Sequence, residues 1–134
     1  MVAVESRCGN LTTVLVIDDE RMICWSIEQT LRAAGHTVVA AETAAEGLRL
    51  YRNLHPGVVF LDVKLPDADG LAVLKCMKDE AGENGAPVIV MTAFDEGDTR
   101  AAALRLGACA YLRKPFDFDR LEAVVAEALA SEHS

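Results

Sequence analysis

The chain of 134 residues carries 13 Lys or Arg and 21 Asp or Glu, which gives a formal charge of −8, and 51% of its residues are hydrophobic. This length suits one domain with its own buried core, and the negative charge argues against a nucleic-acid-binding module, which needs basic side chains to neutralise phosphates. No apolar run approaches the roughly 18 residues that span a bilayer, and the first ten residues have no secretory-signal pattern, so we expect a soluble, cytoplasmic protein that contacts no membrane.

Short apolar runs alternate with longer amphipathic stretches five times along the chain. The run at 14–17 has four branched apolar residues, which is typical of a strand buried on both faces. A helix is predicted over about 21–34, where Ile23, Ile27 and Leu31 recur every four residues. Further strands are predicted at 37–41, 58–61, 87–91 and 109–112, and further helices from Thr43, over 71–79, over 98–106 and from Asp117. Thr43 with Glu46 matches a capping box, and Asp117 is a preferred N-cap residue.

This (βα)5 alternation indicates an α/β fold with right-handed crossovers and helices on both faces of a parallel sheet. The chain is too short for a closed eight-fold barrel, so we predict a doubly wound, open, five-stranded parallel sheet. We assign residues 13–131 to this domain, residues 1–12 to a flexible N-terminal arm and residues 132–134 to a tail.

Polar side chains follow four of the five predicted strands. Asp18 and Asp19 follow the first, Asp62 the third, Thr92 the fourth and Lys114 the fifth. The carboxyl ends of parallel strands share one edge of a sheet, where ligands bind in open α/β folds, so we expect these side chains to converge.

Three carboxylates at one edge would repel one another unless a cation lies between them. All-oxygen ligands without His or Cys favour Mg²⁺ over zinc, and such sites commonly hold a phosphate as well. Lys114 supplies a compact cation and Thr92 a hydroxyl for a phosphoryl group, while Asp62 is our candidate nucleophile for an aspartyl phosphate.

The sequence resembles the response regulator receiver domains of bacterial two-component signalling over residues 13–130. The matching motifs are VLVIDDE (14–20), VVFLDVKLPDADG (58–70), VIVMTAF (88–94) and GACAYLRKPF (107–116). Each motif alone is weak, whereas all four in this order are specific.

The resemblance implies a flavodoxin-like strand order of 2-1-3-4-5 and a role for each matching residue. Asp62 would accept a phosphoryl group from a sensor histidine kinase, and Lys114 and Thr92 would contact that group. Asp19 would bind Mg²⁺ directly, Asp18 largely through water, and Lys64 through its backbone carbonyl. Tyr111 matches the switch aromatic that turns inward when Thr92 moves, and the bond between Lys114 and Pro115 matches a position that is usually cis.

The resemblance extends to the nitrogen-regulation class of transcriptional activators, through Trp25 and Glu28 in the first predicted helix and through YLRKPFDFDRL (111–121). It implies that the fourth helix, fifth strand and fifth helix form a candidate homodimer surface. Any binding of nucleic acid would belong to segments outside this domain.

Two other functions remain open from the residues alone. A phosphohydrolase of the haloacid dehalogenase type would need an Asp two residues after the nucleophile, where this chain has Lys64. A flavodoxin-like cofactor binder would need a phosphate-holding first loop, and this loop is acidic.

Each site residue also has a plain structural interpretation. Asp18, Asp19 and Glu20 suit the start of a helix by their charge alone, and Tyr111 suits simple packing. We expect the remaining loop acids, which include Asp67 and Asp69, to be solvated and to bind no metal.

Overall fold

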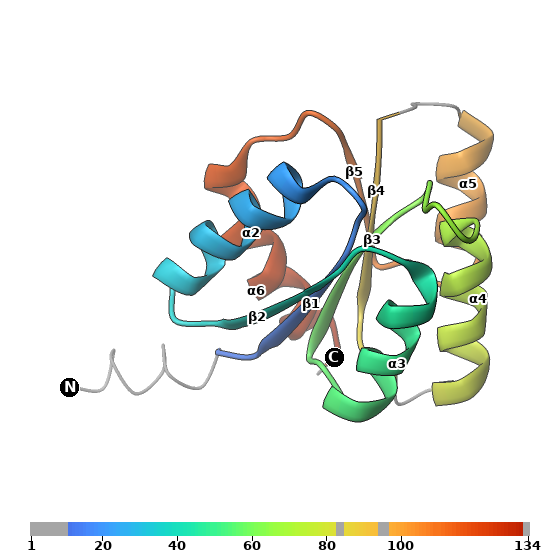
Figure 1. The fold of residues 1–134 in the computed structure, drawn as a ribbon, viewed down its shortest axis with the longest axis horizontal. Helices are drawn as coiled ribbons and strands as arrows, with labels where there is room; N and C mark the ends of the chain where they lie inside the picture. Colours follow the sequence, from blue (N-terminus) through green and yellow to red (C-terminus); the bar gives the residue numbers. More distant parts are fainter. Residues whose placement is uncertain (1–10, 83–84, 94–96, 133–134) are drawn as a thin grey trace.

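The computed structural model describes residues 11–82, 85–93 and 97–132, and in these ranges five strands alternate with five α-helices (Figure 1). The strands are β1 (Thr13–Ile17), β2 (Thr37–Ala41), β3 (Val58–Asp62), β4 (Val88–Thr92) and β5 (Ala110–Arg113). The helices are α2 (Arg21–Ala33), α3 (Ala44–Leu54), α4 (Gly70–Ala81), α5 (Gly97–Arg105) and α6 (Leu121–Glu132), with the 3₁₀ turn η2 (Phe118–Arg120) before α6.

The five strands form one parallel sheet in the order β2-β1-β3-β4-β5, which confirms the predicted fold and strand order. The chain moves outward from β1 to β2 in one direction and from β3 to β5 in the other. The strand order therefore reverses between β1 and β3, which is the place where open α/β sheets bind ligands.

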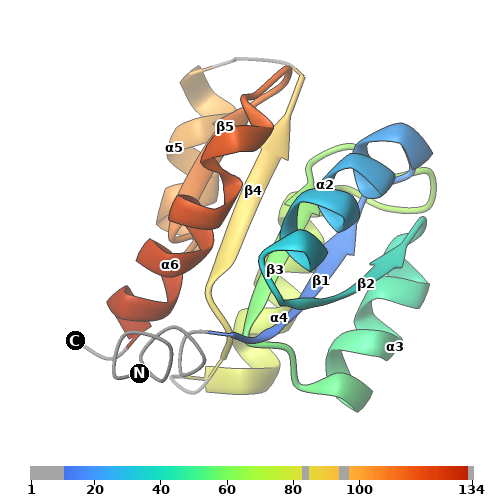
Figure 2. The same cartoon turned by 90° about the vertical axis from the view of Figure 1, so that its left-hand side faces the viewer.

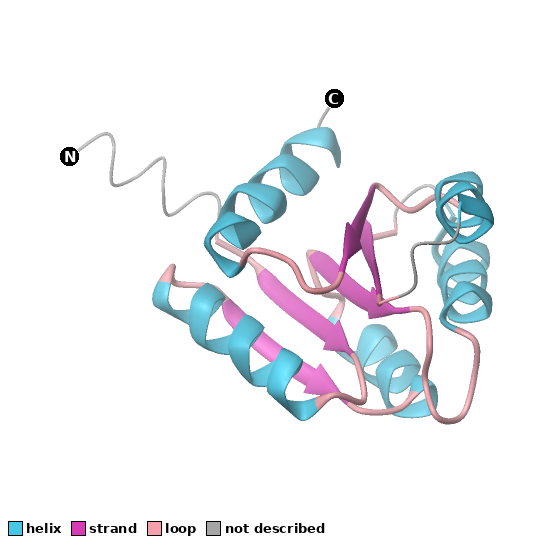
Figure 3. Cartoon of the chain, turned by 90° about the horizontal axis from the view of Figure 1, so that it is seen from above, coloured by secondary structure: helices cyan, strands magenta, loops and turns pink. Residues whose placement is uncertain are grey.

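Helices cover both faces of the sheet, with α2 and α6 on one face and α3, α4 and α5 on the other (Figures 2 and 3). Alternate side chains of β1 enter the two cores: Val14 and Val16 lie in the core with Ile27 of α2, and Leu15 and Ile17 lie in the core on the side of α3 and α4. These four residues of β1 are completely buried, whereas Thr13 at its start is partly buried. Burial on both faces explains why this strand is continuously apolar instead of alternating.

Capping side chains set several helix starts. Thr43 Oγ1 accepts a hydrogen bond from Glu46 N at 3.2 Å, as the capping-box pattern predicts, and Asp69 caps α4 through Leu71 N at 2.9 Å. Asp117 accepts from Asp119 N at 2.9 Å, but the helix that it starts is the 3₁₀ turn η2. The final α-helix therefore begins at Leu121, later than predicted, because the first turn is wound more tightly.

Residues 1–10 and 133–134 of the predicted arm and tail lie outside the described residues. Thr12 is hydrogen-bonded at both of its backbone groups: its N–H donates to His36 Nδ1 at 3.1 Å, and its carbonyl accepts from Thr37 N. Within the described ranges, no helix is both long and apolar enough to span a bilayer.

Candidate functional site

The register of the sheet brings the carboxylates of β1 and β3 together at the strand ends. Ile17 pairs with Leu61 across the two strands, so Asp18 and Asp62 come next on each side of the point where strand order reverses. Five polar or charged residues are buried in the described part of the chain. Four of them are predicted site residues, namely Asp18, Asp62, Thr92 and Lys114. Buried polar groups are costly without partners, so their gathering at one edge points to a binding site.

Lys114 links these residues. Its Nζ donates to Asp18 Oδ2 at 2.7 Å and to Glu20 Oε1 at 2.8 Å, and lies 3.6 Å from Asp62 Oδ2. Burial lowers the pKa of Lys114, but the hydrogen bonds to the carboxylates outweigh burial, so the net pKa is raised and the ammonium stays charged. The backbone N–H of Lys114 also donates to the carbonyl of Thr92 at 2.7 Å, which joins the ends of β4 and β5.

The acidity of the Asp62 carboxyl is altered by its surroundings. Burial and the neighbouring charge of Asp18 raise the pKa of Asp62 from 3.8 to about 6, against the opposing effects of Lys114 and of a hydrogen bond from the backbone N–H of Lys64. The raised pKa means that ionisation of Asp62 is unfavourable, because its carboxylate lies beside that of Asp18 in a partly dehydrated site. A second cation at this edge would relieve that cost.

The three acidic residues after β1 differ in their burial and in their contacts. Oxygens of Asp18, Glu20 and Asp62 lie within 4.8 Å of one another; Asp19, which like Glu20 is exposed, is not in this group. The chain bends at Asp19, and the N–H of Glu20 donates to Asp18 Oδ1 at 2.9 Å, while the Glu20 carboxylate accepts from Lys114 Nζ. Glu20 is the site residue that sequence reasoning missed, and the signal that could have found it is its place beside Asp18 and Asp19 at the end of the first strand.

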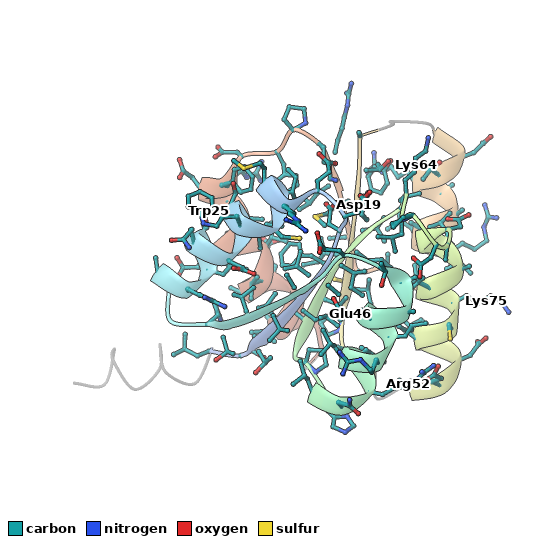
Figure 4. All side chains as sticks on the ribbon, in the orientation of Figure 1. Asp19, Trp25, Glu46, Arg52, Lys64 and Lys75 are labelled. Carbon is teal, nitrogen blue, oxygen red and sulfur yellow. The ribbon has the colours of Figure 1, made fainter. Side chains whose placement is uncertain are left out.

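The other predicted residues lie around the same edge. Lys64 lies on the loop after β3, with its side chain exposed, and Figure 4 shows it at the same end of the sheet as Asp19. Tyr111 of β5 pairs with Val90 and lies two residues before Arg113, which pairs with Thr92. The side chain of Tyr111 is half-buried against the core on the α4 side. The peptide bond between Lys114 and Pro115 is cis, as expected.

The donor set fits Mg²⁺. Three carboxylates supply hard oxygen ligands without any nitrogen or sulfur donor among them, and with Lys114 they carry a net charge of −2. A divalent cation would neutralise that charge.

Comparison with known families assigns the chain. The family model of the response regulator receiver domain matches residues 14–126, which is most of the sequence. The chain belongs to the response regulator receiver domain family. This membership confirms the predicted resemblance and favours a signalling switch over a phosphohydrolase or a flavodoxin-like cofactor binder.

Curated relatives of this receiver domain include transcriptional regulators. The DNA-binding transcriptional regulator NtrC of Escherichia coli is 39% identical over 117 residues, covering 87% of this chain and 24% of that protein. The regulatory protein AtoC of Escherichia coli is 36% identical over 119 residues, covering 89% of this chain and 25% of that protein. The chain thus spans about a quarter of their length, and these relatives confirm the resemblance to the nitrogen-regulation class.

Solved structures agree with the fold. A CheY-like receiver domain from Methanospirillum hungatei superposes with a TM-score of 0.85 at 29% identity, covering 92% of this chain and 97% of that chain. NtrX from Brucella abortus gives a TM-score of 0.84 at 33% identity, covering 92% of this chain and 28% of that chain.

Proposed function

We propose that this receiver domain is a switch controlled by Mg²⁺-dependent phosphorylation of Asp62. The observation that carries the proposal is the buried carboxylate of Asp62 at the point of strand reversal, with Asp18 beside it and the Lys114 ammonium 3.6 Å away. A carboxylate in this position can act as a nucleophile while the lysine neutralises the oxygens of an incoming phosphoryl group.

The donor would be a phosphohistidine of a sensor histidine kinase. An Asp62 carboxylate oxygen attacks the phosphorus, the phosphorus–nitrogen bond breaks, and the imidazole nitrogen keeps the bonding pair and takes a proton from solvent. Asp18, Asp19 and Asp62, with the backbone carbonyl of Lys64, would hold Mg²⁺, and Glu20 would add a further carboxylate beside them. When bound, Mg²⁺ supplies charge neutralisation to the transferring phosphoryl oxygens.

Switching would follow from the new charge on Asp62. Thr92, buried at the end of β4, would move its hydroxyl toward the phosphoryl oxygens, and Tyr111 on the neighbouring strand would turn into the space that it leaves. The face formed by α5, β5 and α6 would then change shape and bind a second copy of the domain. The curated relatives are transcriptional regulators, so transcription is the output that we propose, carried by other segments.

The test is phosphorylation of the purified domain by acetyl phosphate with Mg²⁺, followed by intact-mass measurement. We expect one added phosphoryl group that hydroxylamine removes, and none in EDTA or in Asp62→Asn. Asp79→Asn removes an exposed carboxylate on α4 and should be labelled like the wild type. Labelling that persists in Asp62→Asn would refute the assignment of the phosphoacceptor.

A further inference from the structure

The tip of the loop between β3 and α4 is bonded to a different helix. Asp67 Oδ1 accepts from Ala44 N at 2.8 Å and Asp67 Oδ2 accepts from Ala45 N at 3.0 Å, so one carboxylate bridges to the first turn of α3. These hydrogen bonds hold the pKa of Asp67 below its usual range, so its carboxylate is ionised. We call the two hydrogen bonds from Ala44 N and Ala45 N the Asp67 clasp. The expectation of a merely solvated loop acid was therefore incomplete, since the exposed side chain of Asp67 caps a helix more than twenty residues earlier in sequence.

This clasp goes beyond what α3 needs to begin. Thr43 already caps the helix through Glu46 N, and it is the residue that directly precedes the helix. Asp67 serves the two preceding N–H groups, which have no partner within the helix. By contrast, Asp69 caps α4, the helix of its own loop. Asp67 thus adds a connection between two segments.

The base of the same loop is bonded to the candidate phosphoacceptor. The backbone N–H of Lys64 donates to the Asp62 carboxylate. The loop is closed on itself by Gly70 N to Val63 O at 2.6 Å, by Leu65 N to Ala68 O at 3.3 Å, and by a bridge between Lys64 and Asp69. A closed loop moves as one unit, so a restraint on its tip is carried to its base.

We propose that Asp67 is a positioning residue: its clasp on the start of α3 holds the β3–α4 loop so that Lys64 stays against Asp62. The first turn of α3 is thereby coupled to the site. The consequence for Mg²⁺ rests on the proposed function, because it takes the Lys64 carbonyl as a ligand. Coupling between two sites is reciprocal, so Mg²⁺ should in turn slow amide exchange at Ala44 and Ala45.

The first test needs no metal. Hydrogen exchange at the Lys64 amide is measured by NMR in Asp67→Ala and in Thr43→Ala, which removes a cap bond from the same helical turn without touching the loop. After correction for global stability, we expect Asp67→Ala to speed Lys64 exchange about tenfold and Thr43→Ala to leave it unchanged. Asp67→Asn keeps one acceptor oxygen and should lie between Asp67→Ala and the wild type.

The second test is calorimetric titration of the same variants with Mg²⁺. We expect the dissociation constant to rise about tenfold in Asp67→Ala, the lower end of the loss caused by removing an outer partner of a metal site, and to stay unchanged in Thr43→Ala. Equal Lys64 exchange in the two alanine variants would overturn the proposal, because Asp67 would then be only a helix cap. If the wild type binds no Mg²⁺, the proposed function fails, while Lys64 exchange still decides the role of Asp67.

Discussion

Replacing Asp62 with Asn should stabilise the metal-free protein. The ionised carboxylate lies beside Asp18, and its pKa is raised from 3.8 to about 6 by burial and by that neighbour. The folded state therefore holds the Asp62 proton more tightly than the unfolded state does. This contribution to stability is complete below pH 4 and is lost as the pH rises through 6. Asn has nearly the same shape and no charge, so it avoids the loss.

The size of the effect follows from the shift. About two pKa units at ~1.4 kcal/mol each give ~3 kcal/mol as an upper limit at neutral pH. The edge of the sheet is open to water, and screening reduces the expected gain to about 1–2 kcal/mol. For a domain of this length, that gain raises Tm by roughly 3–8 °C.

The assay is thermal unfolding in EDTA at several pH values between 5 and 7.5. We expect the Tm of Asp62→Asn to exceed that of the wild type by a margin that grows with pH. The matched control is Asp79→Asn, which removes the same charge from an exposed pair with Lys75. Adding Mg²⁺ should then raise Tm more in the wild type than in Asp62→Asn. No gain in Tm, a gain independent of pH, or an equal gain in the control would refute the proposed close packing of carboxylates.

Two further substitutions test the geometry. Glu20→Gln removes one of the three clustered carboxylates, while Lys114 Nζ keeps its hydrogen bond to Asp18 at 2.7 Å. The Mg²⁺ affinity measured by calorimetry should therefore fall roughly tenfold. An unchanged affinity would mean that Glu20 does not face the ion. Gly70→Ala places a Cβ 2.7 Å from the Cα of Val63 and against the backbone of Asp62, so urea denaturation should show a loss of about 1–3 kcal/mol. A loss below ~0.5 kcal/mol would show that the loop yields easily.

Periodicity and strand-end chemistry were enough to predict the fold and most of the site. The run of branched apolar residues at 14–17 has no polar face, so a strand there had to be buried on both faces. The alternation of strands and helices then implied a parallel sheet. The three strands that the prediction ended one residue early, β3, β4 and β5, continue through Asp62, Thr92 and Arg113, because these residues still pair with a neighbouring strand. Hydrophobicity marks where burial ends in the sequence, whereas pairing decides where the strand ends.

The sequence by itself determined which residues reach the edge of the sheet. Asp18, Asp62, Thr92 and Lys114 each follow an apolar run, and such a run is buried only as a strand inside the sheet. Only the tertiary structure decided which side chains turn inward there. Glu20 contacts Lys114 Nζ because the chain bends at Asp19, where the N–H of Glu20 donates back to Asp18 Oδ1 at 2.9 Å. The Asp67 clasp depends on the packing of a loop against a helix from another part of the chain, and no local pattern encodes the distance between them.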